Sequence, residues 1–193
     1  MTSTLKTMAL ALLLMSGPVA AALPAPFVPA SFTPPTLAKA SGFKLVPLGP
    51  AVVKIDYDAY MSSLEHLQKT FTRSPDWPNS NITAADAMND METEQAHFQK
   101  RESFAYAVLT PDGKRERGCV YVYPSRIQGY DAVVRLWVTK AEYDAGFDAE
   151  LYAWVQGWMK AKWPFAKVAY PGRAIDWASW DALVAASKTD GKK

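Results

Sequence analysis

A glutamate and a histidine at helical spacing are the first residues in this sequence whose types could carry chemistry. Glu94 and His97 lie three positions apart in an expected helix, which sets a carboxylate and an imidazole about one turn apart. Such a pair could exchange a proton or supply half of a metal site, but a metal ion would need further ligands. We therefore favour a surface or capping role for His97, expect His66 to face solvent, and predict no metal site.

Arg135 is a second candidate because it interrupts an apolar stretch. Alternation along an expected strand places it on one face with Asp131, Val133 and Trp137. A guanidinium in the middle of a strand needs a partner. If this face borders a cleft, Arg135 is a candidate contact for an anion. The simpler alternative is an ion pair with Asp131 or with a helix carboxylate.

The single cysteine, Cys119, opens a stretch in which valines and tyrosines alternate. This pattern predicts a buried thiol, and burial raises the pKa of a thiol, so Cys119 is expected to be inert. One cysteine cannot form an internal disulfide, and together with only two histidines it does not give the usual ligand set of a structural zinc site.

Hydrophobic spacing predicts the helices that would position these residues. Apolar residues recur every three or four positions between residues 57 and 71, which predicts one helix that ends before residue 75. Thr83, with Asp86 three positions later, predicts a capped second helix that runs to about residue 101. A third helix is expected from Asp148, as its cap, to about residue 163, where a proline follows.

Alternating stretches bounded by turn residues predict the strands. An edge strand at residues 43 to 48 is followed, after two helices, by strands at residues 104 to 109, 118 to 123 and 131 to 138, whose short links imply an antiparallel meander. A brief strand at residues 167 to 170 follows the third helix. Since a strand, a helix and a strand in this order require a right-handed crossover, the last strand should run parallel beside residues 131 to 138. A terminal amphipathic turn with Trp177, Trp180 and Val184 is expected to cover the sheet.

The N-terminus carries a secretory pattern. Lys6 precedes an apolar run at residues 8 to 15, and Ala20, Ala21 and Ala22 offer the small side chains that a signal peptidase accepts. We expect residues 1 to 22 to be a signal peptide, 23 to 41 a proline-rich spacer, 42 to 187 the folded domain and 188 to 193 a flexible tail. The apolar run is too short for a stable membrane span, so a periplasmic or secreted location is predicted. A misassigned start codon would instead make the protein cytoplasmic.

Composition limits the classes of partner. The chain of 193 residues is 49% hydrophobic and 12% aromatic, which is typical of a packed globular protein and excludes a disordered chain. Its net charge of +2, without a long basic run, gives no footprint for sequence-independent binding to nucleic acid. Nucleic acid is therefore not an expected partner.

Local sequence and element order together resemble a known superfamily. The stretch FAYAVL from Phe104, the turn PDG from Pro111 and the stretch GCVYVYP from Gly118 are similar to two strands and their hairpin in the GNAT superfamily of N-acetyltransferases. Trp137-Val138 resembles the close of the next strand in that fold, and residues 151 to 173 are similar to a bacterial branch of GNAT-like proteins. The predicted fold class is a GNAT-like mixed α/β sheet, with an antiparallel meander and a β-α-β crossover, truncated at the C-terminus.

The resemblance implies an acyltransferase that moves an acetyl or acyl group from acetyl-CoA, or another acyl donor, to the amine of a small molecule or protein. In GNAT enzymes two neighbouring strands part, and the pantetheine arm of the donor adds along one of them. Trp137, Val138 and Thr139 are the implied donor-binding edge. A tyrosine often protonates the leaving thiolate, which makes Tyr170 the implied acid. Arg135, the candidate anion contact described above, is the second candidate catalytic residue.

The sequence departs from the GNAT pattern at the loop that normally binds pyrophosphate. Residues 139 to 148 contain one glycine, Gly146, and three acids, Glu142, Asp144 and Asp148, which only Lys140 opposes. The last two strands of the superfamily should follow residue 173, but only 20 residues remain. An exported binding module without catalysis, whose cleft takes a peptide, a polyamine or an envelope component, is the alternative hypothesis.

Overall fold

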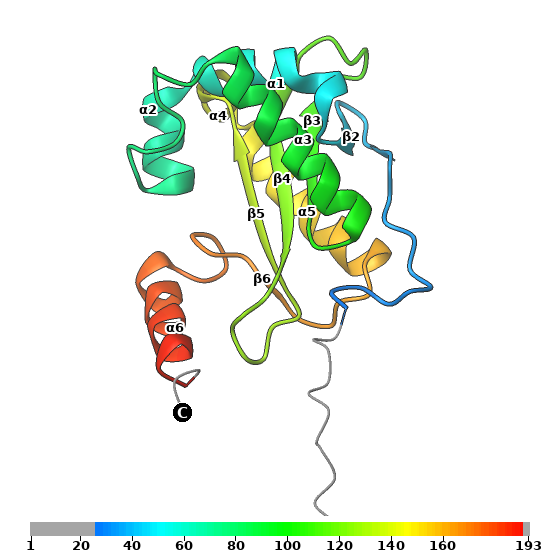
Figure 1. Ribbon diagram of the computed structural model, residues 1–193, viewed down its shortest axis with the longest axis vertical. Helices are drawn as coiled ribbons and strands as arrows, with labels where there is room; N and C mark the ends of the chain where they lie inside the picture. The colour runs from blue at the N-terminus through cyan, green and yellow to red at the C-terminus, as the bar shows by residue number, and fades with distance from the viewer. Residues whose placement is uncertain (1–25, 191–193) are drawn as a thin grey trace, which may run out of the picture.

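One six-stranded sheet organises the protein, whose computed structural model describes residues 26 to 190 (Figure 1). The strands follow one another across the sheet in chain order, and every neighbouring pair is antiparallel except the last, which is parallel. The predicted meander and crossover are thus confirmed. The predicted signal peptide and the last residues of the predicted tail lie outside the described residues. The strands are β1 (Ala38–Lys39), β2 (Lys44–Pro47), β3 (Phe104–Leu109), β4 (Glu116–Pro124), β5 (Ala132–Val138) and β6 (Val168–Ala169).

Helices cover both faces of the sheet. The helices α1 (Val53–Met61) and α3 (Ala84–Lys100) lie on one face, and α5 (Phe147–Lys162) lies on the other (Figure 1). Because side chains alternate along a strand, each strand contributes to two cores: Cys119 and Trp137 face α1 and α3, while Val120 and Leu136 face α5. None of the helices among the described residues has the length and apolar character that crossing a membrane requires.

The predicted helix over residues 57 to 71 is interrupted. The chain instead forms α1, the single turn α2 (Leu64–Leu67) and the π-helical turn η2 (Gln68–Thr72). At the break, the Ser62 hydroxyl donates to the carbonyl of Ala59, at 2.6 Å, and Ser63 leaves helical geometry. Serine hydroxyls compete in this way with the helical ladder. The interruption brings the ring of Phe71 to 5.6 Å from that of Tyr121 on the sheet.

The ends of the two long helices differ in how well the sequence predicts them. Thr83 and Asp86 form the predicted capping box at the start of α3. The predicted cap of α5 is wrong: Gly146 precedes the helix, with a φ of 83°, and Asp148 lies in the first turn. Its carboxylate instead accepts two hydrogen bonds from Arg173, at 2.7 and 2.9 Å. The ion pair between Asp148 and Arg173, which are distant in the sequence, therefore replaces the predicted helix cap.

Residues 26 to 41 differ from the spacer that proline content predicts. Val28 is 1% exposed, and the ring of Phe27 stacks on those of Phe104 and Phe165. The strand β1 pairs with β2, and Arg101 donates to the carbonyls of residues 29 and 32. The apolar side chains between the prolines thus bury against the sheet, because aromatic burial outweighs the extended preference of proline-rich backbone.

The strands β5 and β6 pair over two positions and then part. Ala132 pairs with Val168 and Val133 with Ala169. No described strand pairs with residues 134 to 138 on that side of β5. The chain turns away at Gly172, whose φ of 75° and close approach to the Trp177 ring leave no space for a side chain. The helix α6 (Trp177–Asp190) then lies beyond the sheet and below η2, so the prediction that it covers the sheet is wrong (Figure 1).

Candidate functional site

A pocket of about 340 Å³ lies where β5 and β6 part. We call it the cleft pocket. Its walls come from residues 135 to 138 of β5, from the turn at residues 171 to 173, and from Phe71 of η2 and Trp177 of α6. An ion pair between Arg73 and Asp181, with an N–O distance of 2.8 Å, joins η2 to α6. The helix α6 therefore closes the side of the cleft that has no further strand.

The cleft pocket contains three of the five predicted site residues. Arg135, Trp137 and Val138 line it. Thr139 does not: it is buried at the start of α4 (Lys140–Asp144), where its hydroxyl accepts from the amide of Glu142. Tyr170 belongs to the core on the α5 face, and burial raises its pKa to about 12. Its predicted role as an acid stays a prediction, and the lining of the cleft pocket gives it no support.

Arg135 carries a charge that no carboxylate among the described residues neutralises. Its guanidinium donates to the carbonyl of Phe71 and lies 4.3 Å from the centre of the Phe71 ring. Burial lowers the pKa of Arg135. The predicted alternative, an ion pair with Asp131, is wrong because that carboxylate accepts from the amides of Ala166 and Lys167, at 2.7 and 2.8 Å. An uncompensated guanidinium in a pocket is a contact for an anion.

Further basic side chains line the cleft pocket, and the sequence analysis missed them. Lys69 and Arg173 take part, together with His66, which was wrongly expected to face solvent. The His66 ring is half-buried, 4.9 Å from that of Tyr143, and burial lowers its pKa. The break between α1 and α2 places His66 at the cleft pocket, and the hydrophobic spacing of the sequence does not reveal this break. Arg173 directly follows the Pro-Gly turn, which was the one available signal.

The acids of the loop at residues 139 to 148 do not face the cleft pocket as free charges. Arg115 and Arg117 each approach a carboxylate oxygen of Glu142 to 2.6 Å. Although burial opposes them, their hydrogen bonds hold the pKa of Glu142 below its ordinary value. Lys140 pairs with Asp144 at 2.6 Å, and Asp148 pairs with Arg173 as described above. The prediction that Lys140 alone opposes these acids is therefore wrong.

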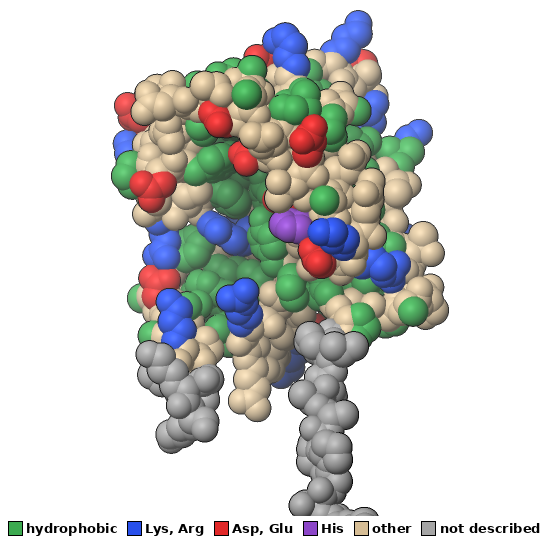
Figure 2. Space-filling view, in the orientation of Figure 1, with side chains coloured by type: hydrophobic (Ala, Val, Ile, Leu, Met, Phe, Trp, Pro, Cys, Tyr) green, Lys and Arg blue, Asp and Glu red, His purple; other side chains and the backbone are tan. Residues whose placement is uncertain are grey.

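A second pocket, of about 290 Å³, lies on the other side of Phe71. We call it the acidic pocket, because the carboxylates of Asp56, Asp90 and Glu94 line it and no Lys, Arg or His in the described part of the chain does so. Figure 2 shows this face hollowed, with hydrophobic side chains in the hollow, acidic side chains near its upper rim and a basic side chain at its middle. Aromatic side chains form most of the remaining wall: Tyr60, Phe71, Trp77, Tyr121 and Tyr123.

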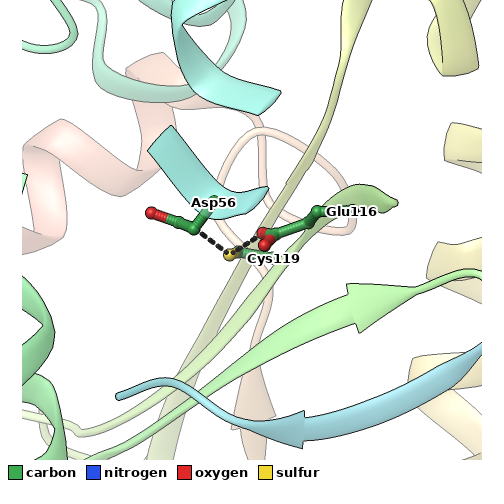
Figure 3. A group of neighbouring side chains, drawn as sticks. All are labelled: Asp56, Glu116 and Cys119. Carbon is green, nitrogen blue, oxygen red and sulfur yellow. Dashed lines mark hydrogen bonds between the residues drawn. The ribbon is translucent and has the colours of Figure 1, made fainter. Parts of the chain in front are cut away.

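At the inner end of the acidic pocket, Asp56 belongs to a buried cluster with Glu116 and Cys119 (Figure 3). The Cys119 thiol donates to Glu116 Oε1 at 2.9 Å and to Asp56 Oδ1 at 3.4 Å. Burial raises the pKa of Cys119 well above its ordinary value, as an inert thiol requires. Burial also raises the pKa of Asp56 to about 6, although hydrogen bonds from its neighbours oppose this.

No local sequence pattern predicts this cluster, because α1 and β4 bring its members together from distant positions. Burial, and then the charge of Asp56, raise the pKa of Glu116. The ligand atoms of Asp56, Glu116 and Cys119 lie within 4.8 Å of one another, so the prediction of no metal site overlooked one grouping that could hold an ion.

The predicted pairing of Glu94 with His97 is not the main contact of either residue. The nearest carboxylate to the imidazole is that of Glu102, at 3.9 Å. This position at the end of α3 is consistent with the favoured surface role of His97. Glu94 instead turns toward the acidic pocket, where its Oε2 atom is buried without a hydrogen-bond partner among the described residues.

Solved structures share this architecture. A protein from Vibrio cholerae that carries the name of a ribosomal-protein-serine acetyltransferase aligns with a TM-score of 0.58 and 12% identity, over 81% of this chain and 84% of that one. The ribosomal-protein-S5-alanine acetyltransferase of Vibrio fischeri aligns with a TM-score of 0.55 and 10% identity, over 78% and 81% of the two chains. No protein-family model and no curated protein matches the sequence. At these identities the likeness establishes architecture, and the chain has the GNAT-like fold that its sequence predicts.

Proposed function

We propose that this protein is an N-acyltransferase that binds an acyl thioester, such as acetyl-CoA, in the cleft pocket. The observation that carries the proposal is the parting of β5 from β6 beside the uncompensated guanidinium of Arg135. Residues 134 to 138 present backbone groups that an extended amide-containing arm can pair with, as an added strand does. The GNAT-like fold of the two Vibrio acetyltransferases supports the same function.

The residues present fit such a donor at its arm and at its phosphates. The open edge of β5 would hold the pantetheine amides, and the guanidinium of Arg135 would attract the anionic groups. Lys69 and Arg173 lie nearby, but Glu65 and Asp148 already pair with them. Gly146, which precedes the long helix α5, has open space around it. Its backbone lets an anion approach the amides at the start of this helix, although the usual glycine-rich loop is absent.

The chemistry that this arrangement supports is nucleophilic acyl transfer. An amine nitrogen attacks the thioester carbonyl, a C–N bond forms, and the C–S bond breaks to release a thiolate. The amine must lose one proton and the thiolate must gain one. The side chains of this protein orient the donor and exclude water, and α6 closes the pocket against solvent.

Titration of the purified protein with acetyl-CoA tests the proposal. Acetyl-CoA should bind the wild-type protein and raise its melting temperature, because a ligand that binds only the folded state stabilises it. Arg135→Met should weaken binding about tenfold, equivalent to the loss of one charge-assisted hydrogen bond. The matched control is Arg126→Met, since Arg126 is exposed and lines neither pocket. Absence of binding at millimolar acetyl-CoA would contradict the proposal.

We also propose that the mature protein is exported. The pattern of Lys6, the apolar run and the small residues up to Ala22 supports this. Mass spectrometry of the protein from its native cells should find an N-terminus near residue 23. Retention of Met1 would contradict export and would leave the acyltransferase proposal unaffected.

A further inference from the structure

The acidic pocket has the charge of a site for a cation. Asp56 enters it from α1, and Asp90 and Glu94 enter it from α3. Two other carboxylates of the fold have cationic partners: Glu142 has two arginines and Asp148 has one. No cationic side chain in the described range lines the acidic pocket. Its carboxylates therefore create a negative potential that a bound cation would satisfy.

Two buried polar atoms at this pocket lack hydrogen-bond partners among the described residues. One is the hydroxyl oxygen of Tyr60, a residue that is only 3% exposed, and the other is Oε2 of Glu94. Tyr60, Asp56 and Asp90 all line this pocket, and burial, followed by the charges of the two carboxylates, raises the pKa of Tyr60. Native structures rarely leave buried polar atoms unpaired. A ligand that donates several hydrogen bonds would satisfy them together.

The aromatic walls of the acidic pocket indicate which kind of molecule would carry the cation. The ring of Trp77 lies 5.3 Å from that of Tyr60 and 6.1 Å from that of Phe71. The rings of Tyr121 and Tyr123 stack on each other, and that of Tyr121 lies 5.6 Å from Phe71. Aromatic faces attract an ammonium group and also cover an apolar body. A volume of about 290 Å³ admits a small molecule and excludes a folded polypeptide chain.

We propose that the acidic pocket binds a small organic ammonium ion with an apolar or aromatic body. This ammonium ion is the acyl acceptor, an assignment that rests on the proposed function. Phe71 lines both pockets, so the bound amine lies next to the cleft in which the donor is proposed to bind. The opposite charges of the two pockets would then sort an anionic donor from a cationic acceptor. Before attack, the ammonium nitrogen gives one proton to the carboxylate of Glu94 and becomes a neutral amine.

Calorimetric titration without any donor tests the binding site by itself. The probes are 2-phenylethylamine, its neutral analogue 2-phenylethanol, and putrescine, which has two charges and no ring. At pH 7.5 we expect 2-phenylethylamine to bind at least tenfold more tightly than either of the others. Equal binding of 2-phenylethanol would overturn the need for a cation, and tighter binding of putrescine would overturn the need for an apolar body. If none of the three probes binds at concentrations up to about 20 mM, the proposed binding site would be overturned.

Variants on α3 locate the binding. Glu94→Gln keeps the side-chain shape and should weaken 2-phenylethylamine about tenfold, and Asp90→Asn should weaken it by a similar factor. Glu92→Gln is the matched control, because Glu92 lies on the same helix but is exposed and outside the pocket. Circular dichroism should be used to check that each variant is folded. Unchanged affinity in both Glu94→Gln and Asp90→Asn would overturn the assignment.

Assays of acyl transfer separate this inference from the proposed function. Binding of 2-phenylethylamine without any acetylated product would contradict the acyltransferase and would leave the ammonium site standing. Acetylation of amines with a KM that Glu94→Gln and Asp90→Asn do not change would support the acyltransferase and would overturn the acidic pocket as the acceptor site.

Discussion

The cleft pocket and the acidic pocket share the ring of Phe71 but differ in the sign of their charge. Arginine and lysine side chains, with His66 and the ion-paired Asp148, line the first, and three carboxylates line the second. The fold produces this difference because β5, η2 and the turn after β6 supply the arginine and lysine side chains, whereas α1 and α3 supply the acids. The contrast teaches that the proposed function depends on unpaired charge: Arg135 in the cleft pocket and the three carboxylates of the acidic pocket have no ion-pair partner among the described residues.

Charge reversal in the acidic pocket should break this contrast most strongly. Glu94→Lys places a cation beside the remaining carboxylates and repels an ammonium ligand, so 2-phenylethylamine affinity should fall roughly a hundredfold or more. Acetyl-CoA affinity should change little, because Glu94 does not line the cleft pocket. Two parallel titrations measure this. An equal loss for both ligands would show that the pockets are not separate sites.

Unpaired and paired carboxylates should affect stability with opposite signs. The folded-state pKa of Asp56, about 6, exceeds its ordinary value of 3.8, so its contribution to stability is present at low pH and is lost as the pH rises through 6. Asp56→Asn should therefore stabilise the protein at pH 7.5, by about 3 kcal/mol, and not at pH 4. Urea unfolding at both pH values measures this, and destabilisation at pH 7.5 would contradict it.

Glu142 provides the opposite case. Its pKa lies below the ordinary value, so its contribution is present at neutral pH and is lost as the pH falls through that lowered value. Glu142→Gln removes the partner of Arg115 and Arg117 and should destabilise the protein by about 1 kcal/mol at pH 7.5. The same unfolding experiment applies. A gain in stability would show that the buried ion pairs cost more than they contribute.

The smallest expected effect concerns the contact that closes the cleft pocket. Asp181→Asn removes the exposed ion pair with Arg73 and should increase the dissociation rate of acetyl-CoA only about twofold, because exposed pairs contribute little. Stopped-flow displacement measures this rate. The affinity of 2-phenylethylamine should not change, since neither residue lines the acidic pocket. A change in the amine affinity alone would contradict the assigned role of α6.

The strand order, the crossover and the capping box at Thr83 could be predicted because each follows from local spacing. The resemblance to the GNAT superfamily placed Trp137 and Val138 at the donor-binding edge, and alternation along the strand placed Arg135 on a face that could border the cleft. The acidic pocket could not, since Asp56, Glu94 and Tyr121 come from three elements that only tertiary packing brings together. Asp148 was misplaced because a distant partner, Arg173, outweighed its local capping preference.

Backbone amide hydrogen exchange on β5, with and without acetyl-CoA, tests the central claim most directly. If the donor adds along the open edge where β5 and β6 part, saturation with acetyl-CoA should slow exchange at amides of residues 134 to 138 that face β6, and Arg135→Met should reverse the effect at the same ligand concentration. Protection elsewhere in the protein, with unchanged exchange along β5, would contradict the claim.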